Sequence, residues 1–236
     1  WLEGTAARAA AIGVAAHLWV AAALLFSTLE EEPSDTSRAG TALRPWKLLR
    51  EDSTFARFVA ARGFLTATAL APPYLVILAG DGDSGLGTLG ALVIASAAAS
   101  FLSSYAWGRF ADHSSRQVLI AAGVLGGLAM AAAIGASLTG LAATVWAMPV
   151  VLFVLMIAHH GVRQGRSTYL VDIADDDNRA AYAATANTLI GGLLLISGAI
   201  GGALSFIGPM AALGGFAVMA LVGSGVALGL KEAEGA

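Results

Sequence analysis

The chain has 236 residues, of which 57% are hydrophobic and 12% are charged, and its formal net charge is −3. A soluble domain carries about 25% charged residues, so this composition and a mean hydropathy of +0.75 indicate a membrane protein. The chain has no cysteine, which excludes disulfides, thiolate catalysis and cysteine-bound metals, and the sequence shows no basic face suited to nucleic acid.

Seven apolar runs are long enough to cross a bilayer as helices. About 20 residues rising ~1.5 Å each cover ~30 Å of hydrocarbon, and the fifth run reaches that length if it extends through Gly161 towards Tyr169. Backbone polar groups must bond internally in lipid, and no alternation of period two suggests a barrel, so we expect an all-α integral membrane protein. The runs are residues 6–27, 58–80, 86–107, 117–138, 143–161, 183–206 and 209–230.

Basic residues occupy alternate connections between these runs. They lie in the first, third and fifth connections and in the tail, whereas "GDGDSG", "TGLAA" and "IGPM" contain none. The positive-inside rule therefore predicts that residue 1 lies outside and that the C-terminus is cytoplasmic, in a membrane such as the bacterial inner membrane. The basic residues on the cytoplasmic side are Arg38, Arg44, Lys47, Arg50, Arg57, Arg109, Arg116, Arg163, Arg166, Arg179 and Lys231.

Residues 28–57 differ from the rest of the chain. The segment "STLEEEPSDTSRAG" is acidic and polar with Pro and Gly, which is typical of a flexible linker. The segment "LRPWKLLREDSTFARF" mixes apolar and basic residues, as a short amphipathic helix on the cytoplasmic surface would. The chain is thus predicted to consist of one helix (1–27), a linker (28–57) and six helices (58–236). It begins with Trp1, so we expect it to be part of a longer protein.

A polar turn interrupts the third connection as "GRFADHSSR". Taken alone, it is a solvated loop that obeys the positive-inside rule. The spacing of Gly108, Asp112 and Arg116 nevertheless resembles the loop signature of major facilitator superfamily transporters, although His113 and Ser115 replace the usual basic residue and glycine. In that family the signature follows the second helix of each six-helix half, and here it follows the second helix after the linker.

The stretch "GVRQGRSTYLVDIADDDNRAAYAATANT" also resembles the family, with Arg179 opening its eleventh helix. The resemblance covers the whole chain and implies the sixth helix, the central loop and a C-terminal half of two inverted three-helix repeats. It implies that Asp112 pairs with Arg163 or Arg166, and that Arg116 pairs with Asp172. The helix end on which Asp112 docks across the halves would belong to an N-terminal half that this chain lacks.

Candidate residues of a substrate pathway lie inside the predicted helices. Pro72 and Pro73 must break backbone hydrogen bonds, as a passive kink or as a hinge beside the pathway. Tyr74 follows the break and is a candidate lining residue. The remaining candidates, with their simpler interpretations, are Arg62 (snorkelling to headgroups), Asn187 (hydrogen bonding between helices) and His159 (a proton carrier if transport is proton-coupled).

These features predict transport of a small solute by alternating access, together with the missing N-terminal half or a second copy, in a lipid bilayer. The alternatives are a seven-helix receptor or a non-transporting membrane scaffold. A retinal protein is excluded because Lys47 and Lys231, the only lysines, lie outside the helices. No catalytic or metal-binding set converges on one face, so we expect no enzyme activity, no cofactor and no metal.

Overall fold

The computed structural model describes residues 2–28, 45–80, 86–174 and 179–232, and within them every regular element is helical. The chain divides into two units, Trp1–Gly40 and Thr41–Ala236, which are described separately. Most of the predicted linker, residues 29–44, lies outside the described residues, as do the connections at 81–85 and 175–178.

The first unit contains one helix, α1 (Leu2–Ser27), which includes the predicted run 6–27. Its 26 residues rise about 39 Å, more than the ~30 Å of a hydrocarbon core. At its end the hydroxyls of Ser27 and Thr28 donate to the carbonyl oxygens of Leu24 and Leu25, each at 2.7 Å. That α1 crosses a membrane stays a prediction.

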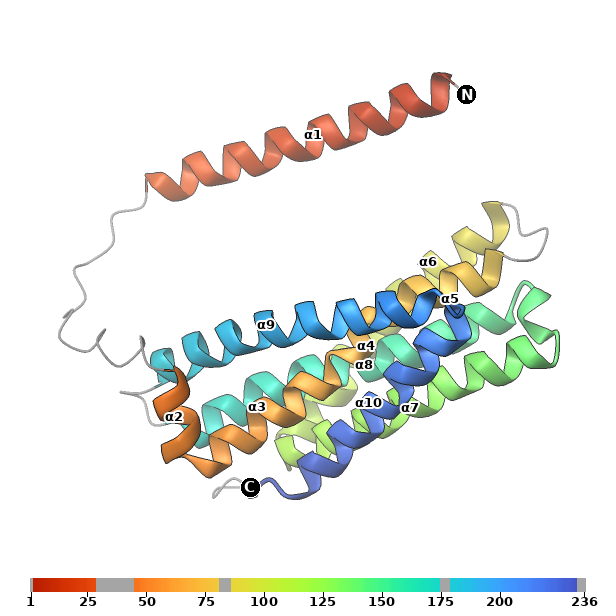
Figure 1. The fold of residues 1–236 in the computed structure, drawn as a ribbon. Helices are drawn as coiled ribbons and strands as arrows, with labels where there is room; N and C mark the ends of the chain where they lie inside the picture. The colour runs from red at the N-terminus through yellow and green to blue at the C-terminus, as the bar shows by residue number, and fades with distance from the viewer. Residues whose placement is uncertain (1, 29–44, 81–85, 175–178, 233–236) are drawn as a thin grey trace. The chain divides into compact units, whose positions relative to one another are not determined.

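The second unit contains six segments that are long and apolar enough to cross a membrane (Figure 1). Consecutive segments run in opposite directions, so the bundle has two ends. The end that holds the start of α3, the α6–α7 turn and residues 229–232 is called the tail end. The elements are α2 (Pro45–Glu51), α3 (Ser53–Leu65), α4 (Ala67–Leu70), α5 (Pro72–Gly80), α6 (Leu86–Ala111), α7 (Ser115–Leu138), the 3₁₀ turn η2 (Leu141–Ala143), α8 (Ala147–Ile173), α9 (Arg179–Ser205) and α10 (Pro209–Leu228).

The first of the six segments is broken, as the prolines predict. Helix α4 ends at Leu70 and α5 begins at Pro72, because a proline ring occupies space needed by the preceding turn and offers no N–H. A second interruption at Thr66 separates α3 from α4, and there the Thr66 hydroxyl donates to Gly63 O at 2.6 Å. That the break works as a hinge stays a prediction.

The predicted surface helix is real but shorter than expected. Helix α2 ends at Glu51, and Asp52 starts α3 as an N-cap, its Oδ1 accepting from the amides of Thr54 and Phe55 at 2.9 Å each. The first membrane segment therefore begins at Ser53 rather than at residue 58. Leu48 of α2 packs against the bundle core.

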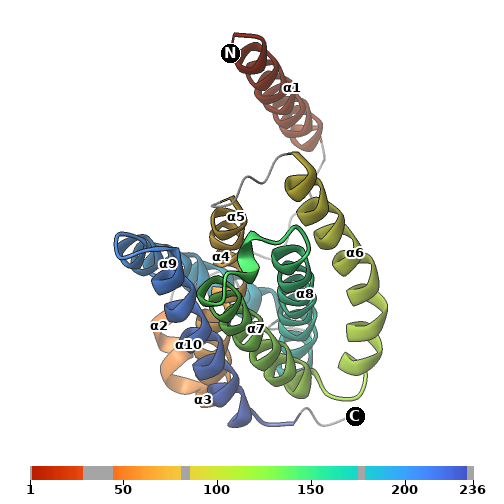
Figure 2. The same cartoon turned by 90° about the vertical axis from the view of Figure 1, so that its right-hand side faces the viewer.

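The core lies between α7, α8, α10 and the broken helix, whereas α6 and α9 are the least buried of the six segments and lie at opposite edges (Figure 2). One cluster near the tail end includes the fully buried rings of Phe55, Phe58 and Tyr169. A second cluster fills the other half around Met130 and Phe216. Helix α6 packs along α8 with Leu92 and Ala99 buried, and the polar cleft described below lies between the same two helices.

Glycines allow the closest approach between α6, α7 and α8. A β-carbon added at Gly161 would lie 2.7 Å from Cε2 of Trp107 and 2.8 Å from Cβ of Ala122. The Trp107 indole is fixed there because its Nε1 donates to Ile157 O at 2.8 Å. By contrast, a β-carbon added at Gly108 would meet no atom of the described residues within 4 Å.

Candidate functional site

The polar turn of the loop signature lies at the tail end, between α6 and α7. The amide of Asp112 donates to Gly108 O at 3.1 Å and that of Ser114 to Phe110 O at 3.2 Å, which closes the turn. The Ser114 hydroxyl then caps α7 by accepting from the amide of Gln117 at 3.1 Å. The Asp112 side chain is exposed, so the turn presents a carboxylate on the surface.

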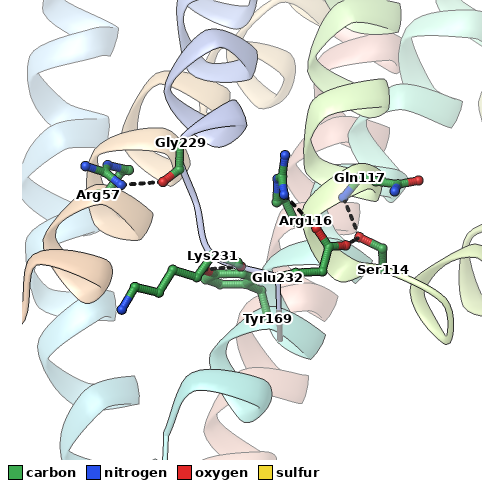
Figure 3. A network of polar contacts seen from close by, with 8 residues as sticks. All are labelled: Arg57, Ser114, Arg116, Gln117, Tyr169, Gly229, Lys231 and Glu232. Carbon is green, nitrogen blue, oxygen red and sulfur yellow. Dashed lines mark hydrogen bonds and ion pairs between the residues drawn. The ribbon is translucent and has the colours of Figure 1, made fainter. Parts of the chain in front are cut away.

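The C-terminal residues fold back over this turn (Figure 3). The Glu232 carboxylate accepts from Arg116 Nη1 at 2.6 Å and from the Ser114 hydroxyl. The Tyr169 hydroxyl of α8 donates to Lys231 O at 3.1 Å. In addition, Arg57 of α3 donates to the carbonyl oxygen of Gly229. We call this set the tail clasp, and it ties α3, α7 and α8 to the end of α10.

The pairing predicted for Arg116 with Asp172 is wrong. Arg116 binds Glu232, and Asp172 Oδ2 instead accepts from the Ser115 hydroxyl at 2.6 Å. Within the described part of the chain, no hydrogen bond or ion pair joins Asp112 to Arg163 or Arg166, contrary to the expected pairing. Both arginines face another site because they project from a different side of α8.

Arg179 begins α9, as predicted, at the same end of the bundle. Three residues later, Tyr182 packs edge-on against Phe55 with ring centroids 4.7 Å apart. The Tyr182 hydroxyl donates to Asp52 Oδ2 at 2.8 Å, so the N-cap of α3 also holds the first turn of α9. The tail end is thus connected through polar contacts from α3, α7, α8 and α9.

Replacing Glu232 with Gln is expected to weaken the tail clasp modestly. The side chains of Arg116 and Glu232 are 29% and 44% exposed, so solvent screening limits the pair to about 0.5 kcal/mol. A double-mutant cycle with Arg116→Gln, measured by unfolding in mixed detergent, should give that coupling at low salt and less at about 1 M salt. A salt-independent coupling above about 2 kcal/mol would contradict the screened pair.

A second group of polar residues lies inside the bundle. Arg62 of α3 is only 8% exposed, and its Nη2 donates to Asn187 Oδ1 of α9 at 2.8 Å. On the opposite side of the broken helix, the buried Thr68 hydroxyl lies 3.3 Å from His159 Nδ1 of α8. The structure therefore brings two predicted pathway residues, Arg62 and Asn187, into direct contact.

Tyr74 lies elsewhere, packed edge-on against Phe216 of α10 with ring centroids 5.7 Å apart. It is half-buried at the margin of an apolar cluster, which gives it a packing contact. Nothing in the described structure places it next to Arg62 or His159.

Arg163 and Arg166 lie on a helix and not in a connection, because α8 continues to Ile173, well beyond the predicted end at 161. They line a polar cleft of about 360 Å³ between α6 and α8, which we call the α6–α8 cleft. The sequence analysis did not predict the residues that line this cleft from α6. The lining residues are Ser100, Ser103 and Ser104 from α6, and His160, Arg163, Gln164, Arg166 and Ser167 from α8.

The charge around this cleft is positive. Arg166 lies within electrostatic range of both Arg62 and Arg163, and Arg163 acts in the same way on His160. The six membrane segments carry one acidic residue, Asp172, in the last turn of α8, where it accepts from Ser115. Over the described residues, no group of three or more His, Cys, Asp or Glu side chains is placed to hold a metal.

No protein-family model, curated protein or solved structure matches the chain. The function proposed below therefore rests on the fold, the polar contacts at the tail end and the α6–α8 cleft.

Proposed function

We propose that this chain is the C-terminal half of a major facilitator transporter, preceded by the sixth helix, in a membrane such as the bacterial inner membrane. The half would rock against an N-terminal partner and expose a midplane solute site to each side in turn. The observation that supports this proposal is the packing order of the six segments, which is the order that two inverted three-helix repeats would give.

The contacts between helices can be compared by matching each of the first three segments with the segment three places later in the chain. The broken helix then corresponds to α8, α6 to α9 and α7 to α10. Helix α7 packs on α8 and α10 packs on α3, whereas the extensive packing of α6 on α8 corresponds to a much smaller contact of α9 on α3. The central contact between α7 and α10 maps onto itself. Two three-helix units related by a two-fold axis in the membrane plane would give these pairs.

The two exposed segments also support a missing partner. Helices α6 and α9 are the least buried, and Gly191, Gly198 and Gly202 on α9 meet no neighbour within 4 Å. Small residues in membrane helices allow close helix approach, so an open glycine surface favours docking of further helices.

Asp112 has the position that a latch between halves requires. Its carboxylate is exposed at the tail end, and the turn beneath it is held by Ser114 and the tail clasp. A carboxylate is stabilised by the free amides at a helix N-terminus, so an end of a helix from the other half is a suitable partner. Arg163 and Arg166 are then free for the α6–α8 cleft.

Solute uptake into liposomes tests this proposal. The product of the complete reading frame that contains this chain should exchange labelled solute across the bilayer, whereas this chain alone should not. The bundle unit without α1 serves as a control. Its unfolding transition shows whether the six segments are folded, so that a loss of uptake can be told apart from a loss of folding. Uptake by the purified chain as a monomer would refute the assignment as a half.

A further inference from the structure

The structure points to a solute class, an inference that rests on the proposed transport function. We propose that the α6–α8 cleft binds the carboxylate or phosphate group of a soluble, multiply charged anion, and that Arg62, which lies outside the lining, adds positive charge nearby. Arg163 and Arg166 hold the anionic group, and His160 and the α6 serines complete the wall.

The residues of the cleft form one continuous polar surface. On α8, His160, Arg163, Gln164 and Ser167 follow the spacing i, i+3, i+4, i+7, which places them on one stripe of the helix, and Arg166 lies beside that stripe. On α6, Ser100, Ser103 and Ser104 likewise share one face, directed towards α8. Two guanidinium groups on neighbouring turns match carboxylate or phosphate oxygens, because each guanidinium offers a planar pair of donors.

The depth of the arginines requires an aqueous or protein-lined environment. Helix α8 has 27 residues and rises about 40 Å, so it exceeds a ~30 Å core by about 5 Å at each end. Arg163 lies ten residues before Ile173, about 15 Å from the end of the helix, and a helix centred in the bilayer would hold it about 10 Å inside the hydrocarbon. A charge at that depth is too costly to face lipid, so the exposed Arg163 faces a cavity.

The cleft also contains polar atoms that have no partner. His160 Nε2 and Ser103 Oγ, which belong to lining residues, are buried without a hydrogen bond. Buried polar groups normally have partners, so these atoms mark hydrogen-bonding capacity that a ligand can fill.

The sign of the charge selects the ligand. Among the described residues, no carboxylate lines the cleft, and the nearby arginines repel one another when the cleft is empty. A bound anion is attracted by the arginines and offsets the repulsion between them, whereas a bound cation would add further repulsion. A second cavity, of about 540 Å³ between α3, α9 and α10, is lined by apolar side chains apart from Ser197 and offers no such charge.

Binding to the full chain, purified in an uncharged detergent, tests this inference. The soluble probes are citrate and inorganic phosphate, and the lipid probe is dihexanoyl phosphatidylglycerol, all titrated by calorimetry at constant ionic strength. We expect saturable binding of a soluble probe. Arg163→Gln and Arg166→Gln should each weaken it about tenfold, the loss of one charge-assisted hydrogen bond.

Arg109→Gln is the matched control, because Arg109 is an exposed arginine of α6 that does not line the cleft. It should change the affinity less than twofold. Equal losses in all three variants would show non-specific charge attraction and overturn the site. Saturable binding of the lipid probe alone would overturn the proposal that the ligand is a soluble anion. Transport of a neutral or cationic solute by the complete protein would refute the anion class and leave the transport function standing, whereas anion binding without transport would do the reverse.

Discussion

Replacing Gly161 with Leu is expected to destabilise the bundle more than any other single change considered for this chain. The new side chain would project into Trp107 and Ala122, and neither can retreat easily. The indole is held by its bond to Ile157 O, and Ala122 is a fully buried residue of α7. Overpacking of a rigid site costs about 3 kcal/mol at the upper end of its usual range. Unfolding in mixed detergent should show a loss of that size.

Gly108→Leu is the control for this experiment. Gly108 lies on α6 next to Trp107, but a β-carbon there meets open space. Leucine also has the better helix propensity, by about 0.8 kcal/mol, so this variant should be neutral or slightly stabilising. If the two leucine variants unfold alike, α6 and α8 do not make the close contact described.

The second large effect is expected to have the opposite sign. Arg62→Met should raise the stability of the bundle while it weakens anion binding. Arg62 is only 8% exposed, and the nearby charge described for it is that of Arg166, which repels it. Replacing buried charged groups with apolar residues of similar volume stabilises proteins by about 1–4 kcal/mol. The side chain of Asn187 is exposed and can bond to water when Arg62 is removed.

The measurement is the same unfolding transition, combined with calorimetric titration of citrate. Arg109→Met serves as the control, and as an exposed substitution it should change stability by less than about 0.5 kcal/mol. Lower stability of Arg62→Met would show that Arg62 makes a net favourable contact. The buried charge of Arg62 would then not destabilise the bundle as we expect.

The membrane segments could be predicted from the sequence because hydrophobic length alone determines them. The largest difference concerns α8, whose apolar run is bounded at residue 161 with an extension towards Tyr169, and which continues as a helix to Ile173. Its last twelve residues carry Arg163 and Arg166, whose charge lowers the local hydropathy although the backbone stays helical. A helix with a polar face towards a cleft has the same low hydropathy as a loop between helices.

The contacts of the candidate sites were harder to predict. Asp112, Arg116 and Asp172 were correctly placed at one end of the bundle, yet their partners were not. Glu232 lies 116 residues from Arg116 in sequence, and only the path of the chain after α10 brings the two together. The α6 serines gave no signal either, because serine is common in helices that pack closely in membranes.

The tail clasp has a consequence for how this unit can be rearranged. Arg57, near the start of the first membrane segment, bonds to the carbonyl oxygen of Gly229, just after the last segment, so the two ends of the six-segment unit are neighbours. A short linker could join them without crossing the bilayer, and new termini could be opened at η2, at the other end of α7. The two ends of the six-segment unit are therefore adjacent, and its order of synthesis is one of several that could produce the same packing.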